Sequence, residues 1–112
     1  MGDGAGVAEM KRGEIRWYRF RAPDKLRPVI ILTRDSVMDY LGEVTVAPIT
    51  STIRDIPSEV LVGPDDGVPR LCAINLDHLQ TVAKNRLGGV VATLPAARMA
   101  EVRDALLFAL GY

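Results

Sequence analysis

The sequence predicts a mainly β protein that ends in a single α-helix. Short segments of alternating apolar and polar residues, bounded by glycine, proline or acidic residues, recur from residue 12 to residue 92, as expected for strands. After residue 95 the apolar period changes to three and four residues, as expected for an amphipathic helix. Many short strands followed by one helix favour a small, strongly bent sheet or barrel with the helix packed on it.

Each predicted strand follows from its local pattern. In the first, Ile15 and Trp17 occupy one face, and Glu14, Arg16, Tyr18 and Phe20 the other. A short turn over residues 21–26 leads to the second, which begins with Pro28, a position that suits a residue without an N–H. Residues 35–41 predict a loop or helical turn. The predicted strands are residues 12–20, 28–33, 42–50, 58–62, 71–75, 79–82 and 89–92.

The C-terminal segment predicts a helix with clear ends. Pro95 suits its start and Gly111 its stop. The apolar stripe of this helix is Met99, Val102, Leu106, Ala109 and Leu110.

The chain length fits one domain. Residues 1–9 contain three glycines and no periodicity, which predicts a disordered N-terminal tail. Residues 10–112 then form the single folded domain. No apolar run approaches the roughly 20 residues of a membrane span, and the single cysteine, Cys72, excludes an internal disulfide. These features are typical of a cytoplasmic protein with no membrane association.

The net charge of zero conceals an uneven distribution. Residues 11–34 carry eight basic and two acidic side chains, whereas residues 35–77 carry eight acidic side chains against Arg54 and Arg70. The basic segment is either solvated surface or a surface that attracts an anion. Charge by itself leaves both interpretations open.

Several kinds of site are excluded by residue type. With one histidine and one cysteine, no cluster has the spacing of a zinc site, so no metal is predicted, and no other cofactor. The glycines at 88 and 89 lack the strand, loop and helix setting of a phosphate-binding loop. His78 is interpreted as a surface or partly buried ring.

An arginine and a hydroxyl group remain as candidates for chemistry. Arg27 stands just ahead of one apolar strand, and Thr50 and Ser51 end another. Arginine can hold two phosphate oxygens in a planar fork, and a hydroxyl can donate to the same group. If the two strand ends meet, they form a small site for a phosphodiester; otherwise Arg27 is a surface residue and the hydroxyls cap a turn.

Four motifs in order resemble those of the MazF/PemK/Kid family, bacterial toxins of type II toxin–antitoxin pairs. The motifs are Arg12-Gly13-Glu14-Ile15, Arg27-Pro28-Val29-Ile30-Ile31-Leu32, Val46-Ala47-Pro48-Ile49-Thr50-Ser51, and residues 74–82. The resemblance covers residues 11–110. It departs from the family where Arg16 replaces a tryptophan and where residues 21–26 lack the usual glycines.

The resemblance implies a small SH3-like barrel with a C-terminal helix, assembled as a homodimer. It also implies a sequence-selective, metal-independent endoribonuclease that cleaves single-stranded RNA and is inhibited by an antitoxin with an acidic, disordered tail. By position in the motifs, Arg27 and Thr50 are the expected catalytic residues. Ser51, Thr52, Asn75 and Asp77 are expected to bind RNA.

Two other functions remain open from the sequence. A non-enzymatic toxin on the same barrel could poison a topoisomerase by binding it. Alternatively, an inactive barrel could bind RNA or a protein. A pure binder does not require Arg27 and Thr50 together, which favours the nuclease.

Overall fold

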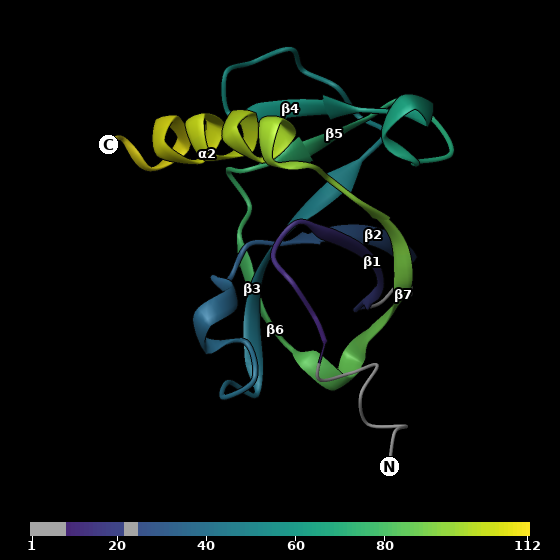
Figure 1. The fold of residues 1–112 in the computed structure, drawn as a ribbon. Coiled ribbons are helices and arrows are strands. Elements are labelled where there is room, and N and C mark those ends of the chain that lie inside the picture. Colours follow the sequence, from purple (N-terminus) through teal and green to yellow (C-terminus); the bar gives the residue numbers. More distant parts are fainter. Residues whose placement is uncertain (1–8, 22–24) are drawn as a thin grey trace.

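The structure is a computed structural model that describes residues 9–21 and 25–112 (Figure 1). Its described part is mainly β with one C-terminal α-helix, so the predicted fold class is confirmed. The strands are β1 (Glu14–Phe20), β2 (Lys25–Ile31), β3 (Glu43–Thr50), β4 (Glu59–Val62), β5 (Cys72–Asn75), β6 (Gln80–Ala83) and β7 (Leu87–Thr93). The helix is α2 (Ala96–Leu110), and short 3-10 turns occur at η1 (Asp35–Val37), η2 (Pro64–Asp66) and η3 (Lys84–Arg86).

The strands form one antiparallel sheet in the order β4-β5-β3-β2-β1-β7. Strand β3 is central. One of its edges pairs with β2, and its other edge pairs with two strands, each along a different part of its length. Its first half, from Glu43 to Val46, pairs with β6, and its last two residues, Ile49 and Thr50, pair with β5. This change of partner bends the sheet, so that β4 and β5 lie with α2 above the other strands in Figure 1.

The bent sheet buries an apolar cluster on each face. The first cluster joins Ile15 and Ile49 to Val102 and Ala105 of the helix. The second includes Val29 and Val46, with Tyr18 and Phe20 packed against it. The alternation predicted for the first strand is therefore correct, since Ile15 faces one cluster and Tyr18 and Phe20 face the other.

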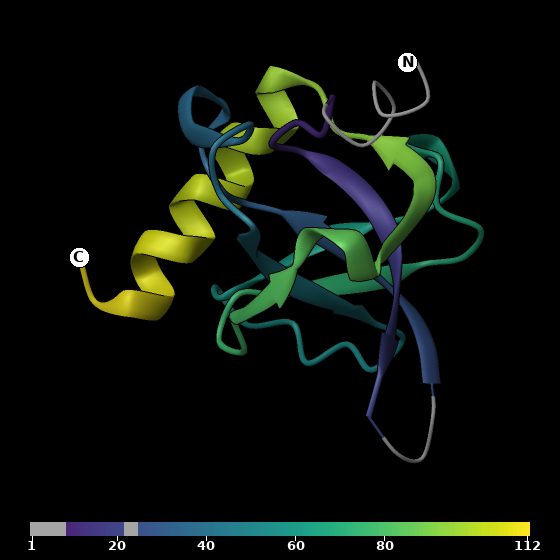
Figure 2. The same cartoon turned by 90° about the horizontal axis from the view of Figure 1, so that it is seen from below.

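The second strand begins earlier than the sequence predicted. It starts at Lys25, which pairs with Phe20 of β1, so two residues assigned to the turn belong to the hairpin. Figure 2 shows this β1–β2 hairpin extending beyond the rest of the sheet. Pro28 is consequently the fourth residue of β2 and not the first. Proline is tolerated here because β2 pairs with β3 only from Val29 onward. No backbone hydrogen bond from residue 28 to β3 is therefore required, and the absence of an N–H costs nothing.

The predicted start of the folded domain at residue 10 stays a prediction. Met10 itself is 3% exposed and belongs to the second apolar cluster. Of the predicted tail, all but Glu9 lies outside the described residues, as do residues 22–24 of the predicted turn. In the described part of the chain, α2 is too short and too polar to cross a membrane.

Candidate active site

The candidate site lies where β2 and β3 part. Their pairing ends at Val29 and Pro48. Beyond that point β2 stays with β1, whereas β3 turns to β5 through the pairs of Ile49 with Ile74 and Thr50 with Ala73. Two residues past the last pair, Arg27 on β2 and Thr50 on β3 stand at the same level on strands that have separated. Side chains at these positions therefore face a shared opening.

Two prolines mark the point of separation. Pro28 lies just past the β2–β3 ladder, and Pro48 lies between the part of β3 that pairs with β6 and the part that pairs with β5. Neither has an N–H to leave unpaired at an interrupted ladder. The Arg-Pro and Pro-Ile-Thr sequences thus form the local geometry that opens the site.

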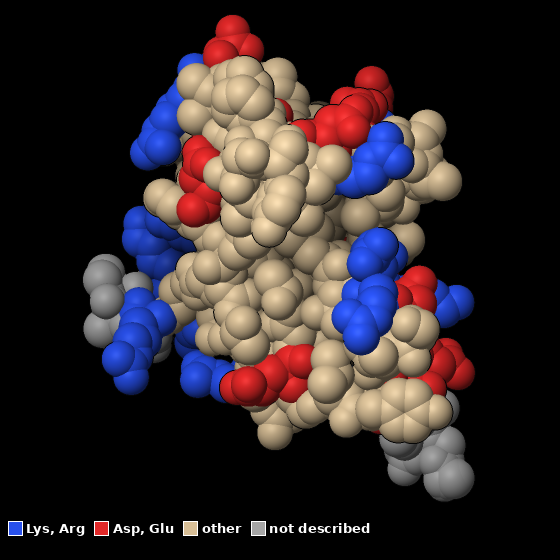
Figure 3. All heavy atoms as spheres, turned by 90° about the vertical axis from the view of Figure 1, so that its left-hand side faces the viewer, with Lys and Arg blue, Asp and Glu red and all other residues tan. Residues whose placement is uncertain are grey.

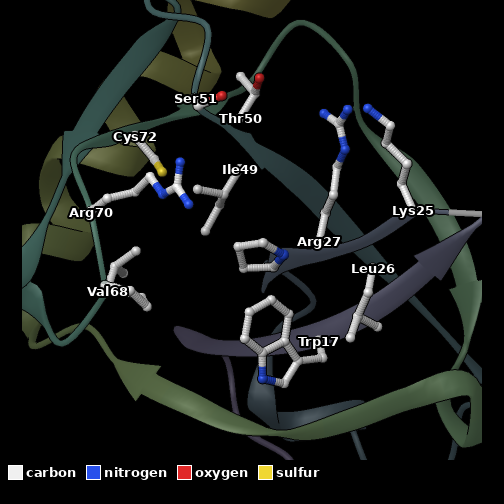
Figure 4. Close-up of a pocket in the computed structure, with 12 residues that line it drawn as sticks. Trp17, Lys25, Leu26, Arg27, Ile49, Thr50, Ser51, Val68, Arg70 and Cys72 are labelled. Carbon is white, nitrogen blue, oxygen red and sulfur yellow. The ribbon is translucent and has the colours of Figure 1, made fainter.

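The largest hollow at this point, here called the Trp17 pocket, has a volume of about 500 Å³ (Figure 4). Arg27 and Thr50 both line it, and Figure 4 shows the guanidinium and the hydroxyl at the same end, with Trp17 at the other. Its lining residues are Trp17, Lys25, Leu26, Arg27, Pro28, Ile49, Thr50, Ser51, Val68, Pro69, Arg70 and Cys72. The two predicted catalytic residues are therefore brought together in one cleft.

A second hollow, the Asn75 pocket, shares Arg27 and Thr50 with the first and measures about 200 Å³. Its lining adds Pro48, Thr52, Arg54, Glu59, Asn75 and His78. Asn75 is 6% exposed, and its orientation is fixed by two hydrogen bonds. Its Oδ1 accepts from Asp77 N at 3.0 Å, and its Nδ2 donates to His78 Nδ1 at 3.2 Å. An accepting Nδ1 leaves the proton of the neutral ring on Nε2.

A third hollow, the Phe20 pocket, places Arg27 beside further basic side chains. It is lined by Phe20, Arg21, Lys25, Arg27, Pro48 and Gln80. Neither this pocket nor the Trp17 pocket has an acidic lining residue among those the structure describes. In these two pockets the side chains around Arg27 therefore attract a polyanion, as the charge of residues 11–34 allowed. Figure 3 shows basic side chains gathered along the margins of another face of the molecule.

The hydroxyl of Thr50 is held ready to donate. Its Oγ1 accepts a hydrogen bond from Thr52 N at 3.1 Å, which leaves its own proton free for another partner. For Arg27, no hydrogen bond or ion pair with another residue in 9–21 or 25–112 is recorded. Both groups can thus bind a phosphate without first breaking a contact within that part of the chain.

The residues predicted to bind RNA divide between the pockets. Ser51 lines the Trp17 pocket, and Thr52 and Asn75 line the Asn75 pocket. Asp77 lines none of the three, and its carboxylate instead accepts a 2.6 Å hydrogen bond from the buried Ser58. It is adjacent to the site through its backbone N–H, which holds Asn75.

Sequence reasoning missed several residues of the site. It placed Trp17 on one face of the first strand with Ile15 and gave it no role, and it interpreted His78 as a surface or partly buried ring. Arg70 reaches the Trp17 pocket from the segment before β5. One signal was available, because Arg70 and Arg54 are the two basic residues in the acidic segment 35–77, and both line pockets that contain Arg27.

Two ion pairs stabilise the surroundings of the site. Arg16, which stands where the family often has tryptophan, is 9% exposed; it donates hydrogen bonds to Glu14 Oε1 at 2.9 Å and to Gly88 O at 3.1 Å.

On α2, Arg98 donates a hydrogen bond to Asp66 at 3.1 Å and another to the Leu61 carbonyl. Burial opposes the charge of Asp66, but hydrogen bonds from Gly63 N–H and Arg98 outweigh it and lower the pKa of Asp66. Arg98 thereby links the helix to η2 and β4.

Within residues 9–21 and 25–112, no three histidine, cysteine, aspartate or glutamate side chains are grouped so that they could hold a metal ion.

Comparison with known proteins identifies relatives over nearly the whole chain. Residues 11–110 match the family described as PemK-like, MazF-like toxin of type II toxin–antitoxin system. The probable endoribonuclease MazF5 of Mycobacterium tuberculosis is 38% identical over 96 residues, which are 85% of this chain and 87% of the relative. Endoribonuclease MazF3 of the same species is 39% identical over 83 residues, 74% of this chain and 81% of the relative.

Solved structures show the same fold. The Mycobacterium tuberculosis toxin MazF-mt6 superimposes with a TM-score of 0.80 at 34% identity, covering 88% of this chain and 96% of that one. A mycobacterial endoribonuclease in complex with its cognate antitoxin gives a TM-score of 0.77 at 28% identity, covering 91% and 95%.

Proposed function

The chain belongs to the MazF/PemK family of type II toxin–antitoxin endoribonucleases, and we propose that it cleaves single-stranded RNA at selected sequences through Arg27 and Thr50. The observation that supports this is the position of both side chains at one end of the Trp17 pocket, at the same level on two separated strands. Relatives of this chain are endoribonucleases by name. The reaction, the substrate and the residue roles are the proposal.

The chemistry requires little of the protein, because RNA carries its own nucleophile. The 2′-oxygen attacks the adjacent phosphorus, the bond from phosphorus to the 5′-oxygen breaks, and the products carry a 2′,3′-cyclic phosphate and a 5′-hydroxyl. The 2′-hydroxyl loses its proton and the leaving 5′-oxygen gains one. No metal is needed for these steps if donors stabilise the charge that develops on the phosphorus oxygens.

Arg27 and Thr50 supply such donors. The Arg27 guanidinium binds the non-bridging oxygens as their charge increases. Thr50 donates to the scissile phosphate and fixes its orientation, because its oxygen already accepts from Thr52 N. Ser51 and Thr52 contact the neighbouring backbone of the RNA from the same strand end. Asn75 contacts RNA in the Asn75 pocket, where Asp77 holds its amide in place.

The test is incubation of the purified protein with a long, unstructured RNA in the presence of a metal chelator. We expect discrete fragments whose 5′ ends accept phosphate from a polynucleotide kinase without prior dephosphorylation. Single-stranded DNA of the same sequence should remain intact, because it lacks the 2′-hydroxyl. RNA that is bound but uncut would instead indicate a binding barrel. RNA that is neither bound nor cut would favour the topoisomerase poison.

The proposed inhibitor is an antitoxin with an acidic, disordered tail. Solved relatives include an endoribonuclease with its cognate antitoxin and a MazE–MazF complex from Deinococcus radiodurans. In this chain, Arg21, Lys25 and Arg27 surround the Phe20 pocket, where an acidic segment would compete with RNA. Single-stranded DNA, which lacks the 2′-hydroxyl and should not be cut, can serve as the competing ligand. If the antitoxin bound the protein without reducing the affinity of the protein for this DNA, the proposed competition would be contradicted.

The proposed assembly is a homodimer. The outer face of α2 exposes Leu107, Phe108 and Leu110, and Leu61 of β4 is exposed beside it. In Figure 3, which faces the C-terminal end of the helix, uncharged atoms cover the central surface. An apolar surface of this kind is typical of an interface. Sedimentation equilibrium should give twice the monomer mass, and Phe108→Glu should lower it toward the monomer.

A further inference from the structure

The Trp17 pocket extends well past the end that holds Arg27 and Thr50. Its other end is formed by the Trp17 ring, and Val68 and Arg70 line one side (Figure 4); Pro69 also lines the pocket. A phosphate occupies only the mouth of such a pocket. The volume of about 500 Å³ lies within the range of small-ligand sites. An aromatic ring, an apolar wall and one cation are the surroundings that a nucleobase finds in RNA-binding proteins.

Trp17 is fixed in this position by the sheet. It lies in β1 opposite Pro28 of β2, and its backbone packs against β7 at Gly88. A Cβ at Gly88 would come within 3.2 Å of the Trp17 Cβ, so the glycine allows this close approach without a shift of either strand. The ring is half-buried, which leaves a face open to the pocket.

Arg70 is carried to the pocket by a well-anchored segment. Val68 is 2% exposed, and its N–H donates to Gly63 O at 3.1 Å. Two residues after Arg70, β5 begins with Cys72, which pairs with Val62. For Arg70 itself, no hydrogen bond or ion pair to another described residue is recorded, and Figure 4 shows its guanidinium directed into the pocket.

The chemistry of Arg70 selects among the four bases. A guanidinium only donates, and its fork suits two adjacent acceptors. Guanine offers O6 and N7 side by side, whereas adenine presents an amino donor next to N7. Uracil separates its two carbonyl acceptors by an N–H. Cytosine has adjacent acceptors, but its smaller ring would cover less of Trp17.

We propose that this end of the pocket binds the base next to the scissile phosphate, with guanine stacked on Trp17 and its O6 and N7 bonded to Arg70. This inference rests on the proposed ribonuclease function for its biological role. It assigns sequence selectivity to Arg70 and Trp17, outside the Arg27–Thr50 pair. Arg70 is then a specificity residue, and its loss should change where RNA is cut more than whether it is cut.

The first experiment maps cut sites on a long transcript. With the wild-type protein, we expect guanine to be enriched at one position beside the cut. A transcript made with 7-deazaguanosine lacks N7 but pairs normally, and those sites should be cut about tenfold to a hundredfold more slowly, the range of one bidentate base contact. Cytosine enrichment, or equal cutting of the 7-deaza transcript, would overturn the assignment of guanine.

Variants of Arg70 separate base recognition from general charge. Arg70→Met should lose the guanine preference, whereas Arg70→Lys should keep part of it, because an ammonium can also donate to O6 and N7 but lacks the planar fork. Arg34→Met is the matched control: it removes an exposed arginine beyond the opposite end of β2 and should keep the preference. Unchanged cut sites in Arg70→Met, with thermal unfolding as in the wild type, would refute the role of Arg70.

A second experiment does not depend on cleavage. Trp17 is the only tryptophan, so its fluorescence reports on stacking directly. Short DNA oligonucleotides lack the 2′-hydroxyl and can bind without being cut. We expect one that contains guanine to quench Trp17 at about tenfold lower concentration than its adenine or 7-deazaguanine counterpart. Arg70→Met should remove this difference.

The two experiments distinguish failure of the inference from failure of the proposed function. Guanine-dependent quenching without cleavage of any RNA would support the base pocket and refute the ribonuclease. Cleavage without guanine dependence in either experiment would leave the ribonuclease intact and refute the base pocket.

Discussion

The Ser58 hydroxyl donates a 2.6 Å hydrogen bond to Asp77 Oδ2, and this contact joins the start of β4 to the turn after β5. Ser58 is 2% exposed, and its carbonyl accepts from Leu76 N at 3.0 Å. The turn that carries Asp77 also positions Asn75 and His78 at the Asn75 pocket. The pair therefore supports the candidate site without lining it.

Loss of the Ser58–Asp77 bond should destabilise the fold more than it impairs catalysis. Ser58→Ala and Asp77→Ala are each expected to lower the free energy of unfolding by about 1–3 kcal/mol, because each leaves a polar partner unsatisfied. Urea denaturation measures the loss, with the exposed Ser36→Ala as the control. If Asp77→Ala abolished cleavage while its stability stayed at the wild-type value, Asp77 would have to contact RNA directly.

Removal of Arg27 or Thr50 should suppress cleavage and leave the fold intact. Arg27→Ala and Thr50→Ala are each expected to slow single-turnover RNA cleavage by at least ~100-fold, the scale of losing one transition-state donor. Thr50→Ser keeps a hydroxyl and should retain most of the rate. Arg27→Lys keeps the charge but loses the fork, so its rate should fall between those of the wild type and the alanine variant. Wild-type rates in both alanine variants would refute the site assignment.

The Asp66–Arg98 pair should make stability depend on pH in the acid range. The pKa of Asp66 lies below its ordinary value of 3.8 in the folded protein, so the folded state favours the charged carboxylate. This contribution is fully present above the unfolded pKa and is lost as the pH falls through the folded pKa. The stability difference between wild type and Asp66→Asn should therefore shrink from about pH 5 to about pH 2.

Chemical denaturation at a series of pH values measures that difference. In an Arg98→Met background, the carboxylate loses one of the two donors that lower its pKa. The pH dependence attributable to Asp66 should then be weaker. An equal pH dependence in both backgrounds would show that Arg98 does not contribute to it.

Gly67 should be intolerant of any side chain. Its φ of 91° lies in the left-handed region, and an added Cβ would lie 3.0 Å from the Ala92 Cβ. Gly67→Ala is expected to cost about 1–3 kcal/mol of unfolding free energy. Gly42→Ala is the matched control, since a Cβ there meets nothing within 4 Å. Because Gly67 directly precedes the segment that carries Arg70, the variant should also weaken guanine-dependent quenching of Trp17.

The positions of most elements could be predicted from the sequence, because local patterns decide them. Alternation placed Ile15 and Tyr18 on opposite faces of the first strand, and in the structure Ile15 belongs to one cluster while the partly buried Tyr18 packs against the other. The period of the last segment, with Pro95 before it and Gly111 after it, predicted the helix that the structure has from Ala96 to Leu110. The start of β2 was predicted wrongly, because pairing with β1 draws Lys25 into a strand that its own sequence does not specify.

By itself, the sequence determined which groups could perform chemistry. It named Arg27 and Thr50, because a fork of donors and a hydroxyl at strand ends are residue types that suit a phosphate. Only the tertiary structure decided that they meet, since their meeting depends on β3 parting from β2 after Pro48 while its other edge changes partner from β6 to β5. The same change of partner brings Arg70 and Trp17 into one pocket from segments that share no local pattern. Strand pairing between distant segments is set by the packing of the whole sheet, and no window of the sequence contains it.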